Sequence, residues 1–131
     1  MLELLVACVL MTAVLAVCLQ IVSAAASQRQ AAAHRLAAVE EASNLMERLS
    51  ARPWSELTPE AAKSMRLSPE AQAALPQGAL SVEITQSPND AGAKRISVEI
   101  RWQEPGGEPA RPVRLVAWRY SIPAHAPREA P

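Results

Sequence analysis

The sequence lacks the charge pattern by which nucleic-acid-binding and lipid-headgroup-binding proteins are recognised. Its 13 Lys and Arg residues balance its 13 Asp and Glu residues, so the formal net charge at pH 7 is zero. Binding to phosphates needs clustered basic residues, and neither a basic cluster nor a polybasic run is present. We therefore expect no nucleic-acid partner.

Cysteine is scarce and is confined to one apolar segment. Cys8 and Cys18 lie ten residues apart, which on a helix separates them by about 15 Å along the axis. A disulfide needs two Cα atoms within about 7 Å, so these residues cannot pair within one chain. We interpret both as small apolar side chains, and the rest of the chain is not a disulfide-stabilised scaffold.

Residue sets for catalysis or metal binding are missing as well. The one aspartate, Asp90, lies in a turn-type sequence. His34 is expected on the solvent side of a long helix and His125 in a C-terminal tail, so they form no metal-ligand set. The 4 glycines lie in turn sequences and form no phosphate loop. We interpret Glu83 and Glu99 as solvated sheet charges, and we expect no enzyme activity, cofactor or metal.

The most informative feature present is a long uncharged segment. No charged residue occurs between Glu3 and Arg29. A helix rises 1.5 Å per residue, so residues 4–22 would span about 28 Å, which matches the hydrocarbon core of a bilayer. We expect residues 1–28 to form a transmembrane helix that contacts the lipid bilayer.

The helical pattern continues through residues 29–52, which we predict to be the amphipathic half of the same helix. The residues become polar but keep a period near 3.6, and no Gly or Pro intervenes before Pro53. Pro disfavours helical geometry at the residue before it, so the helix should end there. The predicted polar face contains Gln30, His34, Glu41, Asn44 and Arg48, and the predicted apolar face contains Leu36, Val39, Ala42, Leu45, Met46 and Leu49.

Residues 53–78 are predicted to be a connecting segment with short helical turns. Thr58 and Ser68 are each followed by Pro and Glu, which is typical of a helix N-cap. Trp54 and Leu57 follow the long helix, and we expect them to fold back onto the sheet as a core anchor because a large aromatic residue buries much apolar area.

Residues 79–121 alternate with a period of two, which predicts antiparallel β-strands separated by turn sequences. In the first two strands the apolar positions are Leu80, Val82, Ile84, Ile96, Val98, Ile100 and Trp102. In the third, residues 113–121, either of two sets could face inward: Val113, Leu115 and Ala117, or Val116, Trp118 and Tyr120.

A three-stranded antiparallel sheet has one apolar face that needs a cover. The only amphipathic element long enough is the 29–52 helix, so the predicted fold class is α+β, with that helix on the sheet. The predicted helix-sheet packing involves Leu36, Val39, Leu45, Met46 and Leu49 with Val82, Val98 and Ile100. Residues 122–131 are rich in proline and are predicted to be a disordered tail.

Glu3 is the strongest candidate for a functional residue. A carboxylate at a membrane boundary is costly unless it is paired, so such a residue is a functional candidate by default. The alternative is that Glu3 lies in the headgroup layer, where it meets the positive end of the helix dipole.

The sequence Met1-Leu-Glu-Leu-Leu-Val-Ala, followed by an aliphatic segment, an amphipathic helix and a short antiparallel sheet, resembles the type IV pilin-like proteins. The closest resemblance is to minor pseudopilins of type II secretion systems, which belong to the prepilin-type N-terminal cleavage and methylation family. The resemblance implies that Glu3 is the assembly glutamate, with Leu2, Leu4, Leu5 and Val6 in the assembly segment.

The resemblance also implies a structural subunit of an envelope filament, in type II secretion or a type IV pilus. Its partners would be other pilin-like subunits and an inner-membrane assembly platform, together with a prepilin peptidase if a leader exists. The expected location is the inner membrane, as a single-pass protein with a periplasmic body. The alternative is a single-pass membrane-anchored scaffold or sensor of an unrelated envelope complex.

Members of this family carry a basic leader that ends in glycine and is cut before a phenylalanine that then becomes N-methylated, whereas this sequence starts at Met1. We expect the natural start to lie upstream of Met1, and the alternative is a relative that is never processed. Without a leader, Arg29 and Arg35 would favour a cytoplasmic body under the positive-inside rule, whereas a basic leader would reverse the orientation.

Overall fold

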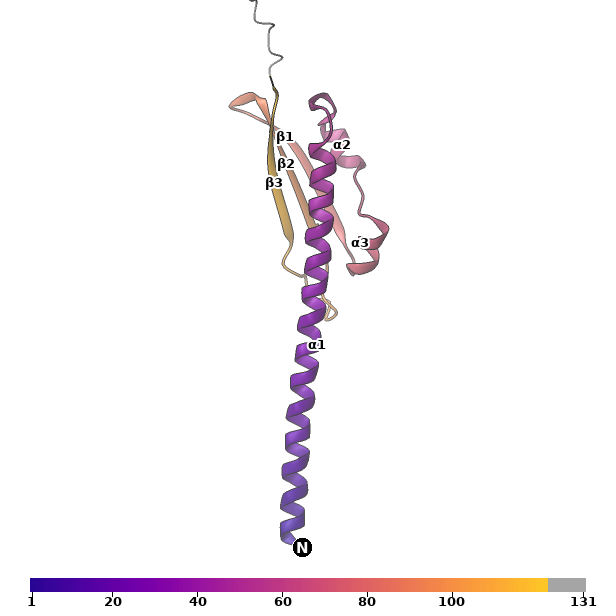
Figure 1. Ribbon diagram of the computed structural model, residues 1–131, viewed down its shortest axis with the longest axis vertical. Coiled ribbons are helices and arrows are strands. Elements are labelled where there is room, and N and C mark those ends of the chain that lie inside the picture. The colour runs from indigo at the N-terminus through magenta and orange to yellow at the C-terminus, as the bar shows by residue number, and fades with distance from the viewer. Residues whose placement is uncertain (123–131) are drawn as a thin grey trace, which may run out of the picture. The chain divides into compact units, whose positions relative to one another are not determined.

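Helix α1 (Leu2–Ser50) is unbroken over 49 residues (Figure 1). The structure is a computed structural model that describes residues 1–122. The helix sequence contains neither Gly nor Pro, and Pro53 follows its last turn, where Pro disfavours helical geometry at the preceding residue. The predicted single N-terminal helix is confirmed.

The chain divides into two structural units. The first unit, Met1–Arg35, consists of the N-terminal part of α1. The second unit, Leu36–Pro131, contains the remaining turns of α1 and every other described element. We call the second unit the body.

Three short helices follow α1: η1 (Trp54–Glu56), α2 (Pro59–Ser64) and α3 (Pro69–Ala74). The N-cap of α2 is Thr58, whose Oγ1 accepts a hydrogen bond from the Ala61 N–H at 3.2 Å. The N-cap of α3 is Ser68, whose Oγ accepts from the Ala71 N–H at 3.2 Å. Both helices have Pro in the first turn, so each begins where the capping pattern predicts.

The sheet contains β1 (Ala79–Ser87), β2 (Asp90–Arg101) and β3 (Val113–Tyr120), in the order β1-β2-β3 with antiparallel pairing. The α+β fold class is therefore confirmed. Val98 in the central strand lies opposite Val82 on one side and Leu115 on the other. The register of β3 is thereby resolved: Val113, Leu115 and Ala117 share the core face, and Val116, Trp118 and Tyr120 lie on the opposite face.

The C-terminal part of α1, from Ala38 to Leu49, lies against one face of the sheet and forms the core of the body with it (Figure 1). Leu45 and Leu49 of α1 are fully buried, as are Val98 and Ile100 of β2. Met46 and Val82 are partly buried against this cluster. Leu57, Ala62, Leu67, Ala71 and Leu75 from the connecting segment complete the cover.

The prediction is wrong for Leu36 and Val39, which are 59% and 38% exposed. The buried positions of α1 in the body are instead Ala38, Glu41, Ala42, Leu45 and Leu49. Leu36 precedes Leu45 by nine residues, about two and a half turns, so it lies on the opposite side of the helix. The core side of α1 thus carries Ala38 and Ala42 as well as leucines, whereas Leu36 and Val39 face outward.

Two residues assigned to the solvent face are also placed differently. His34 is only 8% exposed and Glu41 only 7%. The predicted anchor is half right, because Leu57 is buried whereas Trp54 is only half-buried. Lys94 Nζ lies 4.6 Å from the centroid of the Trp54 ring and donates hydrogen bonds to the carbonyl oxygens of Trp54 and Leu57. The predicted tail beyond Ile122, with His125, lies outside the described residues.

Candidate functional site

The first candidate site is the apolar surface of the first unit. Every residue from 1 to 30 is exposed. The helix contains an 18-residue window with a mean hydropathy of 2.7, and none of that window is buried. Large continuous apolar surfaces are unusual on soluble proteins and mark contacts with membranes or other proteins. By length and composition, α1 is able to cross a membrane.

Glu3 lies in the first turn of α1, where the Leu5 N–H donates to the Met1 carbonyl oxygen at 3.3 Å. Within residues 1–122, its carboxylate makes no hydrogen bond or ion pair. The other assembly candidates, Leu2, Leu4, Leu5 and Val6, are exposed around it. The helix therefore presents one free carboxylate among aliphatic side chains, and both alternatives for Glu3 remain predictions.

The hydroxyl groups of the first unit are all bonded back to the helix. Thr12 Oγ1 donates to the Cys8 and Val9 carbonyl oxygens, Ser23 Oγ donates to the Gln20 carbonyl at 2.9 Å, and Ser27 Oγ donates to the Ala24 carbonyl at 2.8 Å. Such bonds satisfy a hydroxyl without water. This surface therefore suits an environment that offers few hydrogen-bond partners.

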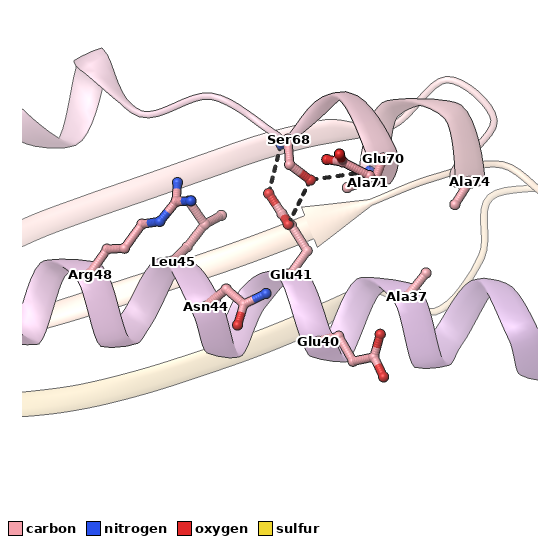
Figure 2. A pocket seen from close by; sticks show the side chains of 10 residues that line it. All are labelled: Ala37, Glu40, Glu41, Asn44, Leu45, Arg48, Ser68, Glu70, Ala71 and Ala74. Carbon is pink, nitrogen blue, oxygen red and sulfur yellow. Dashed lines mark hydrogen bonds between the residues drawn. The ribbon is translucent and has the colours of Figure 1, made fainter.

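The second candidate site is a polar cleft of about 400 Å³ in the body, between α1 and α3 (Figure 2). The Glu41 carboxylate reaches from α1 to Ser68, accepting hydrogen bonds from its N–H at 2.7 Å and its hydroxyl at 2.9 Å. Ser68 Oγ in turn accepts from Ala71 N–H. The buried carboxylate thus joins α1 to the first turn of α3, which is a structural role.

Other polar residues line the rest of that cleft. Its polar lining comes from Glu40, Asn44, Arg48 and Glu70 as well as Glu41 and Ser68. Across residues 1–122, no group of three or more His, Cys, Asp or Glu side chains is placed to hold a metal ion. Glu83 and Glu99 stand on the outward face of the sheet, and Glu99 pairs there with Arg101.

Sequence reasoning missed the link between Glu41 and Ser68. The Ser-Pro-Glu sequence indicated the N-cap of α3, but its second partner lies 27 residues earlier in the chain. Glu41 also lies three positions from Ala38 and four from Leu45, both buried. That spacing on one helix face is the signal that could have placed Glu41 on the core side.

The fold and these sites define an α+β protein whose long N-terminal helix is apolar enough to span a membrane. Comparisons with models of protein families, with curated proteins and with solved structures found no match to this chain. The architecture is compatible with that of pilin-like proteins, because a long N-terminal helix packs on a small antiparallel sheet.

Proposed function

We propose that this protein is a structural subunit of an envelope filament, a minor pilin-like or pseudopilin-like component that assembles through its N-terminal helix. The proposal rests on one observation: a single chain combines two regions of different character. Residues 1–30 expose an apolar helix with a single carboxylate near its start, and the following turns of the same helix pack on a three-stranded sheet.

The apolar surface of the helix would suit both environments of a filament subunit, one before assembly and one after it. Before assembly, residues 1–28 would span the inner membrane, with the body on the periplasmic side. After assembly, the same surface would pack against the helices of neighbouring pilin-like subunits. Association of apolar helices relies on van der Waals packing rather than on release of water. The small residues Ala7, Ala13 and Ala16 would allow close approach of such helices.

Glu3 would give this packing its direction. An ionised carboxylate within an apolar helix bundle is costly, and a nearby positive charge offsets part of that cost. The proposed partner is the free amino terminus of an adjacent subunit, held in position by an inner-membrane assembly platform. Glu3 has no partner among residues 1–122, so its carboxylate is available for such a pair.

Glu3→Gln tests the proposal, because it removes the charge and keeps the side-chain size. We expect incorporation into filaments or tip complexes to fall at least tenfold, while the amount of subunit in the membrane stays the same. The matched control is Glu40→Gln, which neutralises another exposed carboxylate of α1. Unchanged incorporation of the Glu3 variant would remove the assembly role and favour a membrane-anchored scaffold or sensor.

The upstream codons provide an independent test. A filament subunit of this class should have an in-frame basic segment ending in Gly-Phe-Thr just before Met1, which a prepilin peptidase would recognise. Neighbouring genes for a secretion ATPase, a prepilin peptidase or other pilin-like proteins would support the filament, and their absence would favour the scaffold. N-terminal sequencing of the protein from membranes would show whether a leader is removed.

A further inference from the structure

Strand β3 is an edge strand with an unpaired side. In the order β1-β2-β3, it pairs with β2 alone, and no other strand of the described chain lies along its outer edge (Figure 1). An edge strand presents backbone N–H and C=O groups that can pair with a strand from another chain. The eight residues Val113–Tyr120 form a usable length of such an edge.

The outward face of β3 is apolar from Val116 to Tyr120, unlike that of the other two strands. Val116, Trp118 and Tyr120 are 45%, 50% and 63% exposed. The corresponding outward positions are Ser81, Glu83 and Thr85 on β1 and Arg95, Ser97 and Glu99 on β2. The exposed apolar side chains are therefore gathered on β3, which is one of the two edge strands of the sheet. Trp and Tyr are enriched among residues that dominate protein interfaces.

The same strand is positively charged. It contains Arg114 and Arg119 and no acidic residue, and Arg95 of β2 lies opposite Trp118. Arg114 Nε donates to Ser97 Oγ at 3.2 Å, whereas Arg95 and Arg119 form no ion pair within residues 1–122. Arg119 lies opposite Lys94, on the other face of β3 from Trp118, and its Nε is buried there without a hydrogen-bond partner. Acidic side chains on a docking segment would therefore favour its binding to β3.

We propose that β3 is the docking site for an extended, acidic segment of a partner protein, which adds to the sheet as a fourth strand and covers Trp118 and Tyr120. Backbone pairing along the edge would supply affinity, and alternate side chains would supply specificity. Aliphatic residues of the partner would lie beside Val116, Trp118 and Tyr120. Carboxylates at its two ends would lie near Arg114 on that face and near Arg119 on the opposite face. The proposal does not depend on the assembly role of Glu3.

The test uses the full chain in nanodiscs of neutral phosphatidylcholine. The probe is a fluorescent eight-residue peptide of alternating Val and Thr with Glu at both ends, and its control carries Lys in place of Glu. We expect the acidic peptide to bind and the Lys peptide to bind at least tenfold more weakly. Equal binding of the two peptides, or none by the acidic peptide, would overturn the proposal.

Variants locate the peptide on β3. Trp118→Ser and Arg119→Glu should each raise the dissociation constant about tenfold, while Lys63→Glu, an exposed charge reversal on α2, should leave it unchanged. Circular dichroism confirms that each variant is folded. An equal effect of Lys63→Glu would mean that net charge, rather than β3, determines binding, and would contradict the proposal.

Hydrogen exchange tests the mode of docking. A fourth strand should slow exchange at alternate amides of Val113–Tyr120, because only every second N–H faces the free edge. Binding without this protection would exclude strand addition. Burial of Trp118 in phosphatidylglycerol vesicles without peptide, seen as a blue-shifted emission lost in Trp118→Ser, would assign this face to the membrane surface instead. None of these results bears on filament assembly, so the two proposals fail separately.

Discussion

Side chains of the same kind are exposed in one unit of this molecule and buried in the other. Leu15 in the first unit is 55% exposed, whereas Leu45 in the body is 1% exposed, and both belong to the helix α1. Helix formation alone therefore leaves at least half of the surface of Leu15 exposed, and the burial of Leu45 comes from packing on the sheet. The body covers most of its apolar residues with its own chain, whereas the first unit leaves its apolar residues exposed. This difference is the physical basis of the proposed membrane and filament roles.

Deleting residues 1–28 should have the largest effect, because it removes the whole uncovered surface. We expect the truncated protein to move from the membrane fraction to the soluble fraction while the body stays folded, since its core residues begin at Ala38. Ultracentrifugation of lysed cells measures the first outcome, and near-ultraviolet circular dichroism of Trp54 and Trp102 measures the second. A truncated protein that remains membrane-bound would contradict the division into two units.

Leu45→Ala and Leu36→Ala form a matched pair within the body. Leu45 is buried, so its truncation should lower the free energy of unfolding by about 2 to 5 kcal/mol. Leu36 is 59% exposed, so its truncation should change it by less than about 0.5 kcal/mol. Urea unfolding of the full chain in detergent, followed by tryptophan fluorescence, measures both. Similar losses in the two variants would mean that the face of α1 is assigned wrongly.

Glu41→Gln and Ser68→Ala test the polar link between α1 and α3. Each should cost about 1 to 3 kcal/mol, because a buried group loses a hydrogen-bond partner. The double variant should cost less than the sum of the two, because both remove the same interaction. Glu40→Gln is the control, since Glu40 is exposed beside the same cleft. Strict additivity of the two effects would argue against the link.

Val113→Ala and Val116→Ala compare the two faces of β3 and should give the smallest effects. Val113 is 6% exposed and Val116 is 45% exposed. Loss of two buried methyl groups should destabilise the body by about 1.5 kcal/mol, and the outward substitution by less than about 0.5 kcal/mol. The same urea titrations measure the difference. A reversed order would place the other set of side chains in the core.

The sequence was sufficient to predict the elements whose formation depends on residues close together in the chain. The uninterrupted helix follows from the absence of Gly and Pro, and the starts of α2 and α3 follow from Thr58 and Ser68 with the prolines after them. The strands follow from their alternation, and β1 and β2 each have one clearly apolar face.

The elements that could not be predicted depend on contacts between distant residues. Ala38 and Ala42 occupy the core side of α1, although Leu36 and Val39 are more hydrophobic, because burial depends on which side the sheet covers. Both faces of β3 carry apolar residues, so periodicity could not choose its register. Glu3 stays a prediction, because its proposed partner belongs to another molecule.

The native cysteines allow the most direct test of the central claim, that residues 1–28 are covered by molecules other than this chain. Cys8 and Cys18 are both exposed in the isolated molecule. In native membranes, a water-soluble maleimide should label neither of them, even in urea that unfolds the body, whereas an added cysteine in a Leu36→Cys variant should react at once. Labelling of Cys8 and Cys18 as fast as the cysteine at position 36 would show that the helix lies in water and would contradict the account.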